Sequence, residues 1–110
     1  MATLVIGNGR RIAVEVAETR AARRRGLLGR ASVDGGALLI TKCRSVHTLG
    51  MRFAIDVAHL DASMRIVRAR TMSPRRIGVV VLRARHVLEA DAGAFDRWNL
   101  QVGDQLRVEP

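Results

Sequence analysis

Four side chains that could do chemistry lie within residues 43–56, which read CRSVHTLGMRFAID. Cys43, His47 and Met51 follow one another at intervals of four residues, and Asp56 comes five residues later. Positions i, i+4 and i+8 would share one face of a helix, and thiolate, imidazole and thioether ligands together suit Cu(I). A copper site formed by Cys43, His47 and Met51 is therefore one interpretation.

The metal interpretation has a simpler alternative. Gly50 interrupts the segment and its neighbours favour strands, which disfavours a helix there. Structural zinc sites commonly use paired Cys-x-x-Cys motifs, whereas this sequence holds a single cysteine. Cys43 and Met51 would then be small, flexible fillers of the core. We therefore expect no cofactor, and Cys43, His47 and Met51 are the only metal ligands that the sequence suggests.

The same segment allows two arrangements for catalysis. Cys43 and His47 could form a thiolate–imidazolium pair, since cationic neighbours lower a thiol pKa. Alternatively, His47 could act as a base that Asp56 orients, as in hydrolase or lyase chemistry. Asp56 lies in a strand-like stretch, however, where a buried carboxylate needs hydrogen-bond donors. We favour a structural role in which Asp56 ties down the 43–52 segment by accepting hydrogen bonds from Arg52 or loop amides.

The chain is strongly basic. It carries 19 lysine and arginine residues against 10 acidic ones, a net charge of +9, and Lys42 is the only lysine. Residues 20–30 and residues 65–85 contain several arginines and no acid. Such surfaces attract phosphates, nucleic acids and acidic proteins. Nonspecific nucleic-acid binding is one alternative function, although aromatic residues make up only 3% of the chain and offer no stacking platform. A purely compositional origin of the arginine excess is equally open.

Length and composition indicate one folded domain over residues 1–110. With 110 residues, 48% of them hydrophobic, the chain is long and apolar enough to bury a core. We expect the N-terminal stretch MATLVIGNGRR to be neither a signal peptide nor a membrane span. A single cysteine fits a reducing compartment, so we expect a cytoplasmic protein that does not contact membranes.

Local patterns predict a mainly β protein. Thr19 is expected to cap the first helix and Asp91 the second, and residues 79–82, VVVL, fit either a strand or a covering loop. The expected elements are a hairpin over 3–17, a helix over 20–28, strands over 37–41, 54–60, 65–72 and 84–90, a short helix over 93–98, and a strand within 101–109. About seven strands and two short helices predict a small sandwich or closed barrel, with an α+β roll as the alternative.

Three blocks of the sequence resemble an uncharacterised prokaryotic family, the domain of unknown function 192. The blocks are VEVAETRAARRRGLLGR, VHTLGMRFAIDVAHLD and RHVLEADAGAFDRWNLQVGDQL. The resemblance implies a small, mainly β domain with two short helices, and it implies no particular reaction. The chain departs from many relatives in its helix, which is basic here and acidic there. The matching residues are Thr19, Arg25, Gly26, Leu27, His47, Met51, Asp56, Leu88, Glu89, Gly93, Gly103 and Asp104.

Together these observations predict a binding or accessory module rather than an enzyme. The expected site is a cleft between residues 43–56 and the strand at 85–90. Its ligand would be a small anionic molecule or an acidic protein surface, and an arginine would meet the negative charge. The oligomeric state stays open. The expected ligand-binding residues are His47, Met51, Arg52, Phe53, Asp56 and Glu89, and enzyme activity through His47 and Asp56 is the alternative.

Overall fold

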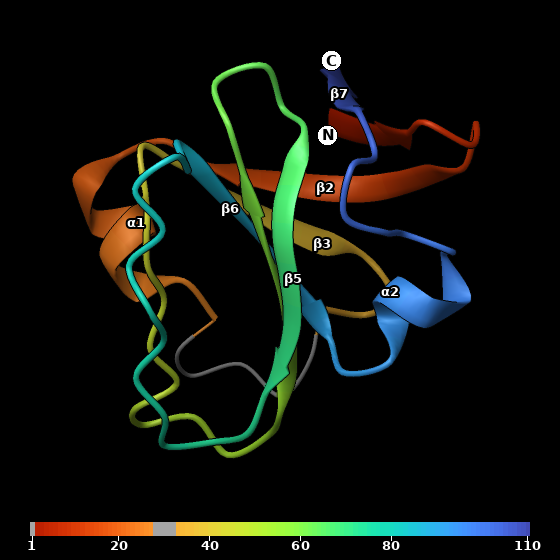
Figure 1. Cartoon of the computed structure of the whole chain (residues 1–110). Coiled ribbons are helices and arrows are strands. Elements are labelled where there is room, and N and C mark those ends of the chain that lie inside the picture. Colours follow the sequence, from red (N-terminus) through yellow and green to blue (C-terminus); the bar gives the residue numbers. More distant parts are fainter. Residues whose placement is uncertain (1, 28–32) are drawn as a thin grey trace.

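The computed structural model describes residues 2–27 and 33–110, which form seven strands and two short helices (Figure 1). The strands are β1 (Ala2–Ile6), β2 (Arg11–Ala17), β3 (Ala37–Thr41), β4 (Ile55–Leu60), β5 (Ile66–Met72), β6 (His86–Asp91) and β7 (Leu106–Glu109). The helices are α1 (Arg20–Arg25) and α2 (Ala94–Arg97), and neither of these described helices is long and apolar enough to cross a membrane. The predicted mainly β fold with seven strands and two short helices is confirmed.

The described strands form one mixed sheet in the order β5-β4-β6-β3-β2-β1-β7. Within this sheet β2 and β3 pair in parallel, and all other neighbours are antiparallel. The sheet curls strongly into a half-barrel, and its two edges approach each other at a bridge between Arg65 and Gln105. Thr3 of β1 pairs with Glu109 of β7, so the N- and C-terminal strands lie side by side (Figure 1).

Side-chain alternation along the strands divides the buried residues between two faces of the sheet. The main core lies on the face that α2 covers, and the second core lies on the face that α1 covers. Every residue of β4 is buried because both faces of this strand are covered. Ile55 and Val57 belong to the second core, whereas Ala58 and Leu60 belong to the main core.

The helix α1 begins as the sequence predicts. Thr19 Oγ1 accepts a hydrogen bond from Ala22 N at 3.0 Å, which satisfies one of the free amides of the first turn. The helix ends at Gly26, whose φ of 50° lies in the region that favours glycine. Its last turn carries Arg23, Arg24 and Arg25.

The prediction that Asp91 caps α2 is wrong. Asp91 Oδ1 accepts a hydrogen bond from Val33 N at 3.0 Å instead. The cap residue of α2 is Gly93, which has a φ of 89° and offers no side-chain hydrogen bond. The amides of Gly93 and Phe95 donate to Asp56 Oδ2 of β4, at 3.1 and 3.0 Å. A neighbouring strand therefore supplies the acceptor that the helix itself lacks.

Two loops lie against each other on the side of the second core. The 43–53 loop connects β3 to β4, and the 73–85 loop connects β5 to β6. Gly78 N donates to Val46 O at 2.8 Å, one of several backbone hydrogen bonds between them. Residues 79–82 form no strand and lie mostly on the surface, so of the two predictions for this stretch the covering loop is the correct one.

Candidate functional site

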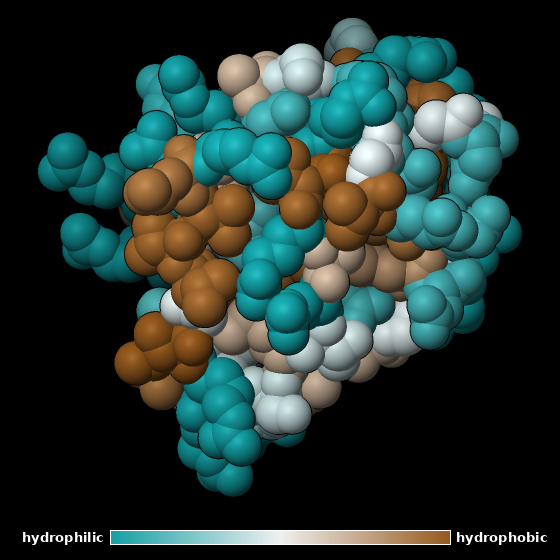
Figure 2. Space-filling view, in the orientation of Figure 1, coloured by the Kyte–Doolittle hydropathy of each residue, from teal (hydrophilic) through white to brown (hydrophobic). Residues whose placement is uncertain are grey.

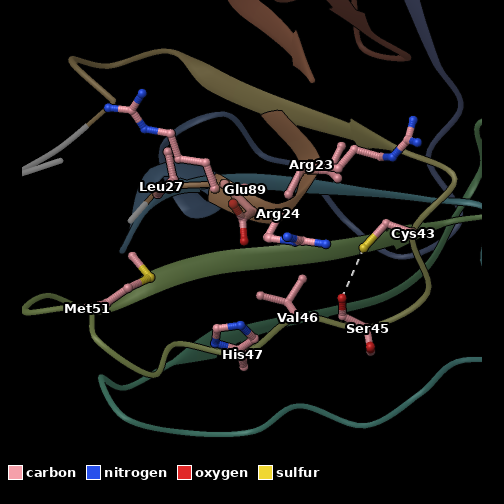
Figure 3. Close-up of a pocket in the computed structure, with 12 residues that line it drawn as sticks. Arg23, Arg24, Leu27, Cys43, Ser45, Val46, His47, Met51 and Glu89 are labelled. Atoms are coloured by element: carbon pink, nitrogen blue, oxygen red, sulfur yellow. Dashed lines mark hydrogen bonds between the residues drawn. The ribbon is translucent and has the colours of Figure 1, made fainter. Parts of the chain in front are cut away.

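A small pocket lies between the last turn of α1 and the 43–53 loop (Figure 3). Its volume is about 70 Å³. The carboxyl group of Glu89, from β6, points into this space (Figure 3), and we call it the Glu89 pocket. The side chains that matter for its chemistry are Arg23, Arg24, Cys43, His47, Met51 and Glu89.

Glu89 is the most unusual residue of the pocket. It pairs with Val57 and Leu38 on the neighbouring strands, and alternation turns its side chain toward the second core. The residue is only 3% exposed, and Oε1 has no hydrogen-bond partner in the part of the chain that the structure describes. Burial raises the pKa of Glu89 from 4.5 to about 7. At neutral pH this carboxyl group is thus close to half protonated, so it can both donate and accept hydrogen bonds.

The last turn of α1 forms the basic rim of the pocket. The side chain of Arg24 extends over the pocket beside Glu89, whereas Arg23 directs its guanidinium away from it (Figure 3). Gly26 brings the chain close to the carboxyl group, because a Cβ at this position would lie 3.4 Å from Glu89 Oε1. The pocket therefore combines a buried acid at its base with positive charge at its mouth.

Cys43, His47 and Met51 all line the pocket, but not in the way that the metal interpretation requires. They lie on the 43–53 loop rather than on a helix, so they share no helical face. Met51 is buried in the second core, and the His47 ring is exposed. Within residues 2–27 and 33–110, no three or more His, Cys, Asp or Glu side chains come close enough to hold a metal ion.

The Cys43 thiol is partly buried and donates a hydrogen bond to Ser45 O at 3.0 Å. Burial raises the pKa of the Cys43 thiol above its ordinary value. We expect iodoacetamide to alkylate Cys43 in the native protein about fivefold or more slowly than it alkylates glutathione near neutral pH, because the thiolate is the reactive form. Mass spectrometry of timed samples measures the rate, and the urea-unfolded protein is the control. Alkylation faster than that of glutathione would instead support a Cys43–His47 nucleophile pair.

Asp56 lies away from the Glu89 pocket. Its position on β4 alternates with Ile55 and Val57, so its side chain leaves the sheet on the face opposite to Glu89. There it is 3% exposed and accepts a hydrogen bond from Thr71 Oγ1 at 2.6 Å, besides the two amides at the start of α2. The structure therefore does not bring His47 and Asp56 together as a base and its orienting carboxylate.

The prediction that Asp56 accepts hydrogen bonds from Arg52 or from amides of the 43–52 segment is wrong. Arg52 and the amides of the 43–52 segment donate nothing to it, because they lie on the other side of the sheet. Arg52 is exposed and Phe53 packs partly against the second core, and neither borders the Glu89 pocket. Of the predicted ligand-binding residues, the pocket gathers His47, Met51 and Glu89. Sequence reasoning missed Arg24, although the neighbouring Arg-Gly-Leu stretch was part of the family resemblance.

The family model DUF192, described as an uncharacterized ACR, matches residues 3–108 of the chain. The chain belongs to the DUF192 family. Six of the twelve motif residues on which the resemblance rests line the pocket of this DUF192 domain: Arg25, Gly26, Leu27, His47, Met51 and Glu89.

Two archaeal relatives carry only a family designation in their names. UPF0127 protein PH1112 of Pyrococcus horikoshii is 33% identical over 63 residues, which cover 57% of this chain and 55% of the relative. UPF0127 protein PF1050 of Pyrococcus furiosus is 36% identical over 62 residues, which cover 56% and 53%. The DUF192 domain thus spans about half the length of these relatives, and neither name states an activity.

Two crystal structures share the fold. A protein of unknown function from Novosphingobium aromaticivorans superposes with a TM-score of 0.81 at 17% identity, over 96% of this chain and 82% of the other. A candidate transcription regulator from Sinorhizobium meliloti also gives a TM-score of 0.81, at 20% identity, over 97% and 91%. At such identities the likeness concerns the fold alone.

Proposed function

We propose that this DUF192 domain is a small-molecule binding module and that its ligand enters the Glu89 pocket. The observation that carries the proposal is the unpaired Oε1 of Glu89, since a buried polar atom without a partner costs about 1–3 kcal/mol. Native proteins satisfy nearly all such atoms, and the exceptions concentrate where a function needs them. A hydroxyl or amine of a ligand would supply the missing donor.

The charge around the pocket suggests the rest of the ligand. Arg24 at the mouth suits an anionic group, because guanidinium groups bind carboxylates through charge-assisted hydrogen bonds. A volume of 70 Å³ holds about five water-sized groups, so the ligand is small or only partly enclosed. A short hydroxy or amino acid meets both requirements: its donor reaches Glu89 and its carboxylate stays at the basic rim.

Binding rather than catalysis fits this arrangement better. The predicted pair of His47 and Asp56 does not meet in the pocket, because Asp56 binds the start of α2 on the opposite face of the sheet. The one thiol in the pocket has a raised pKa, which opposes nucleophilic attack. These points support a module that holds a ligand without transforming it.

A titration with glycolate and acetate tests the proposal, because the two acids differ only in the hydroxyl group. We expect backbone NMR shifts at the pocket and a glycolate Kd about tenfold below that of acetate. Glu89→Met keeps the length of the side chain and removes both oxygens, so it should abolish the difference between the two acids. Arg24→Gln should weaken the binding of both acids about fivefold, because it removes the charge that meets the carboxylate.

Arg97→Gln is the matched control, since it removes one exposed arginine from α2 and should leave both affinities unchanged. Equal affinities for glycolate and acetate in the wild-type protein would contradict a role for Glu89. Binding of short duplex DNA alone, abolished by added salt, would replace the pocket proposal by nonspecific binding through the basic surface.

A further inference from the structure

A second hollow lies between the β4–β5 hairpin and the 73–85 loop, and none of the described residues that line it borders the Glu89 pocket. Its volume is about 300 Å³, which reaches the range of small-molecule sites. His59 pairs with Arg68 and Val57 pairs with Arg70, so alternation presents these side chains on one face of the hairpin. The loop forms the opposite wall. We call this space the His59 hollow.

His59 is buried in the wall of the hollow with no hydrogen bond. The residue is 5% exposed, and within residues 2–27 and 33–110 neither Nδ1 nor Nε2 has a hydrogen-bond partner. A neutral imidazole carries one donor and one acceptor, and leaving both unpaired in the interior is costly. Burial lowers the pKa of His59, and the nearby charge of Arg68 lowers it further. His59 is therefore a neutral ring that lacks a hydrogen-bond partner among the described residues.

Positive charge surrounds this ring. Arg68 and Arg70 come from β5, and Arg76 comes from the loop. No carboxylate of the described residues forms an ion pair with any of these three arginines. Among the described residues, Arg68, Arg70, Arg76 and His59 are the titratable side chains that border the hollow. The arginines would thus concentrate an anion next to an imidazole that can donate to it.

The loop adds an apolar surface to the hollow. Ile77 and Val79 border it and are 78% and 51% exposed, and the neighbouring Val80 and Leu82 are 62% and 80% exposed. Figure 2 shows hydrophobic side chains gathered over this side of the molecule, with hydrophilic ones around them. A contiguous apolar patch on a small domain commonly marks a binding site. A second copy of this chain is disfavoured as the occupant, because its net charge is also +9.

We propose that the His59 hollow is a second binding site, which takes an anionic head group attached to a compact apolar body. The head group, a carboxylate or a phosphate, lies between the arginines and accepts a hydrogen bond from the His59 ring. The apolar body lies against Ile77 and Val79 and removes their side chains from water. The ligand thereby satisfies the buried ring, the unpaired charges and the exposed hydrophobic surface at once.

Four probes test the contributions of the anionic head group and the apolar body to the affinity. Hexanoate and hexyl phosphate carry both parts, acetate carries only the head group, and hexanol carries only the apolar body. We expect at least one of the first two to bind about tenfold more tightly than acetate or hexanol. NMR of the whole chain should show shifts of the His59 ring nitrogens and of amides in the 73–85 loop. A preference for hexanoate would identify a carboxylic acid as the ligand class, and a preference for hexyl phosphate would identify a phosphate ester.

Variants locate the site. Arg68→Gln and Arg70→Gln should each weaken binding about fivefold, whereas Arg97→Gln should not change it. His59→Leu should make hexanoate and hexyl phosphate bind no more tightly than hexanol. The domain should stay folded, since the substitution deletes two unpaired buried polar atoms. Shifts confined to the Glu89 pocket, equal binding of hexanoate and acetate, or no binding by either amphiphile would overturn the proposal.

Discussion

Replacing Glu89 with glutamine should stabilise the domain by about 3 kcal/mol above neutral pH and have little effect below pH 4.5. The folded-state pKa of about 7 lies above the ordinary value of 4.5, so the folded chain binds more protons than the unfolded chain between these values. The free energy of unfolding of the wild-type protein therefore decreases as pH rises from 4.5 to 7, and it levels off above. Glutamine has nearly the same shape and no such titration.

Urea unfolding at a series of pH values measures this effect. The difference between Glu89→Gln and wild type should grow through the window from 4.5 to 7 and then stay constant. Glu18→Gln makes the same chemical change at an exposed position and should leave the pH dependence as it is. Parallel curves for wild type and Glu89→Gln across this window would show that the carboxyl group is not held in an unfavourable environment.

Replacing Asp56 with alanine should destabilise the domain by about 3 kcal/mol, the second large effect. The carboxylate is 3% exposed and accepts hydrogen bonds from Thr71 Oγ1, Gly93 N and Phe95 N, and all three donors would lose this partner. The start of α2 would also detach from β4, which exposes part of the main core. Chemical denaturation followed by the fluorescence of the single tryptophan, Trp98, reports on that region directly.

Asp96→Ala is the matched control, because it removes an exposed carboxylate from the same helix and should change the stability by less than about 0.5 kcal/mol. Thr71→Val should cost an intermediate amount, since it removes one of the three donors. If Asp56→Ala kept full stability and lost glycolate binding, the alternative of an Asp56 that assists His47 would regain support.

Local chemistry made much of the fold predictable. The tight turn after β1 and the cap at Thr19 depend on residues close in sequence, and both formed as expected. The start of α2 did not form as expected, because Asp56 and Phe95 lie 39 residues apart and only the sheet brings them together. A carboxylate in a strand shows that it needs donors, but it does not show which distant amides will provide them.

The candidate site, like the fold, could be predicted only in part. The segment after β3 and the strand β6 were predicted to meet, and His47, Met51 and Glu89 do line one pocket. Arg24 was missed because the position of α1 over the second core depends on the parallel pairing of β2 with β3. The sequence does not single out His59, because a single histidine in a strand is typical of a structural residue. Its relation to Arg68 emerges only once the register of the hairpin is known.

The pairing of β1 with β7 has a consequence for how the chain folds. Thr3 lies opposite Glu109, so β1 cannot complete its pairing until residues 106–109 have been synthesised. Closing so long a loop carries an entropic cost that grows with the logarithm of its length, and folds rich in distant pairings form slowly. A chain emerging from the ribosome would hold β1 with one unpaired edge until residues 106–109 arrive to cover it.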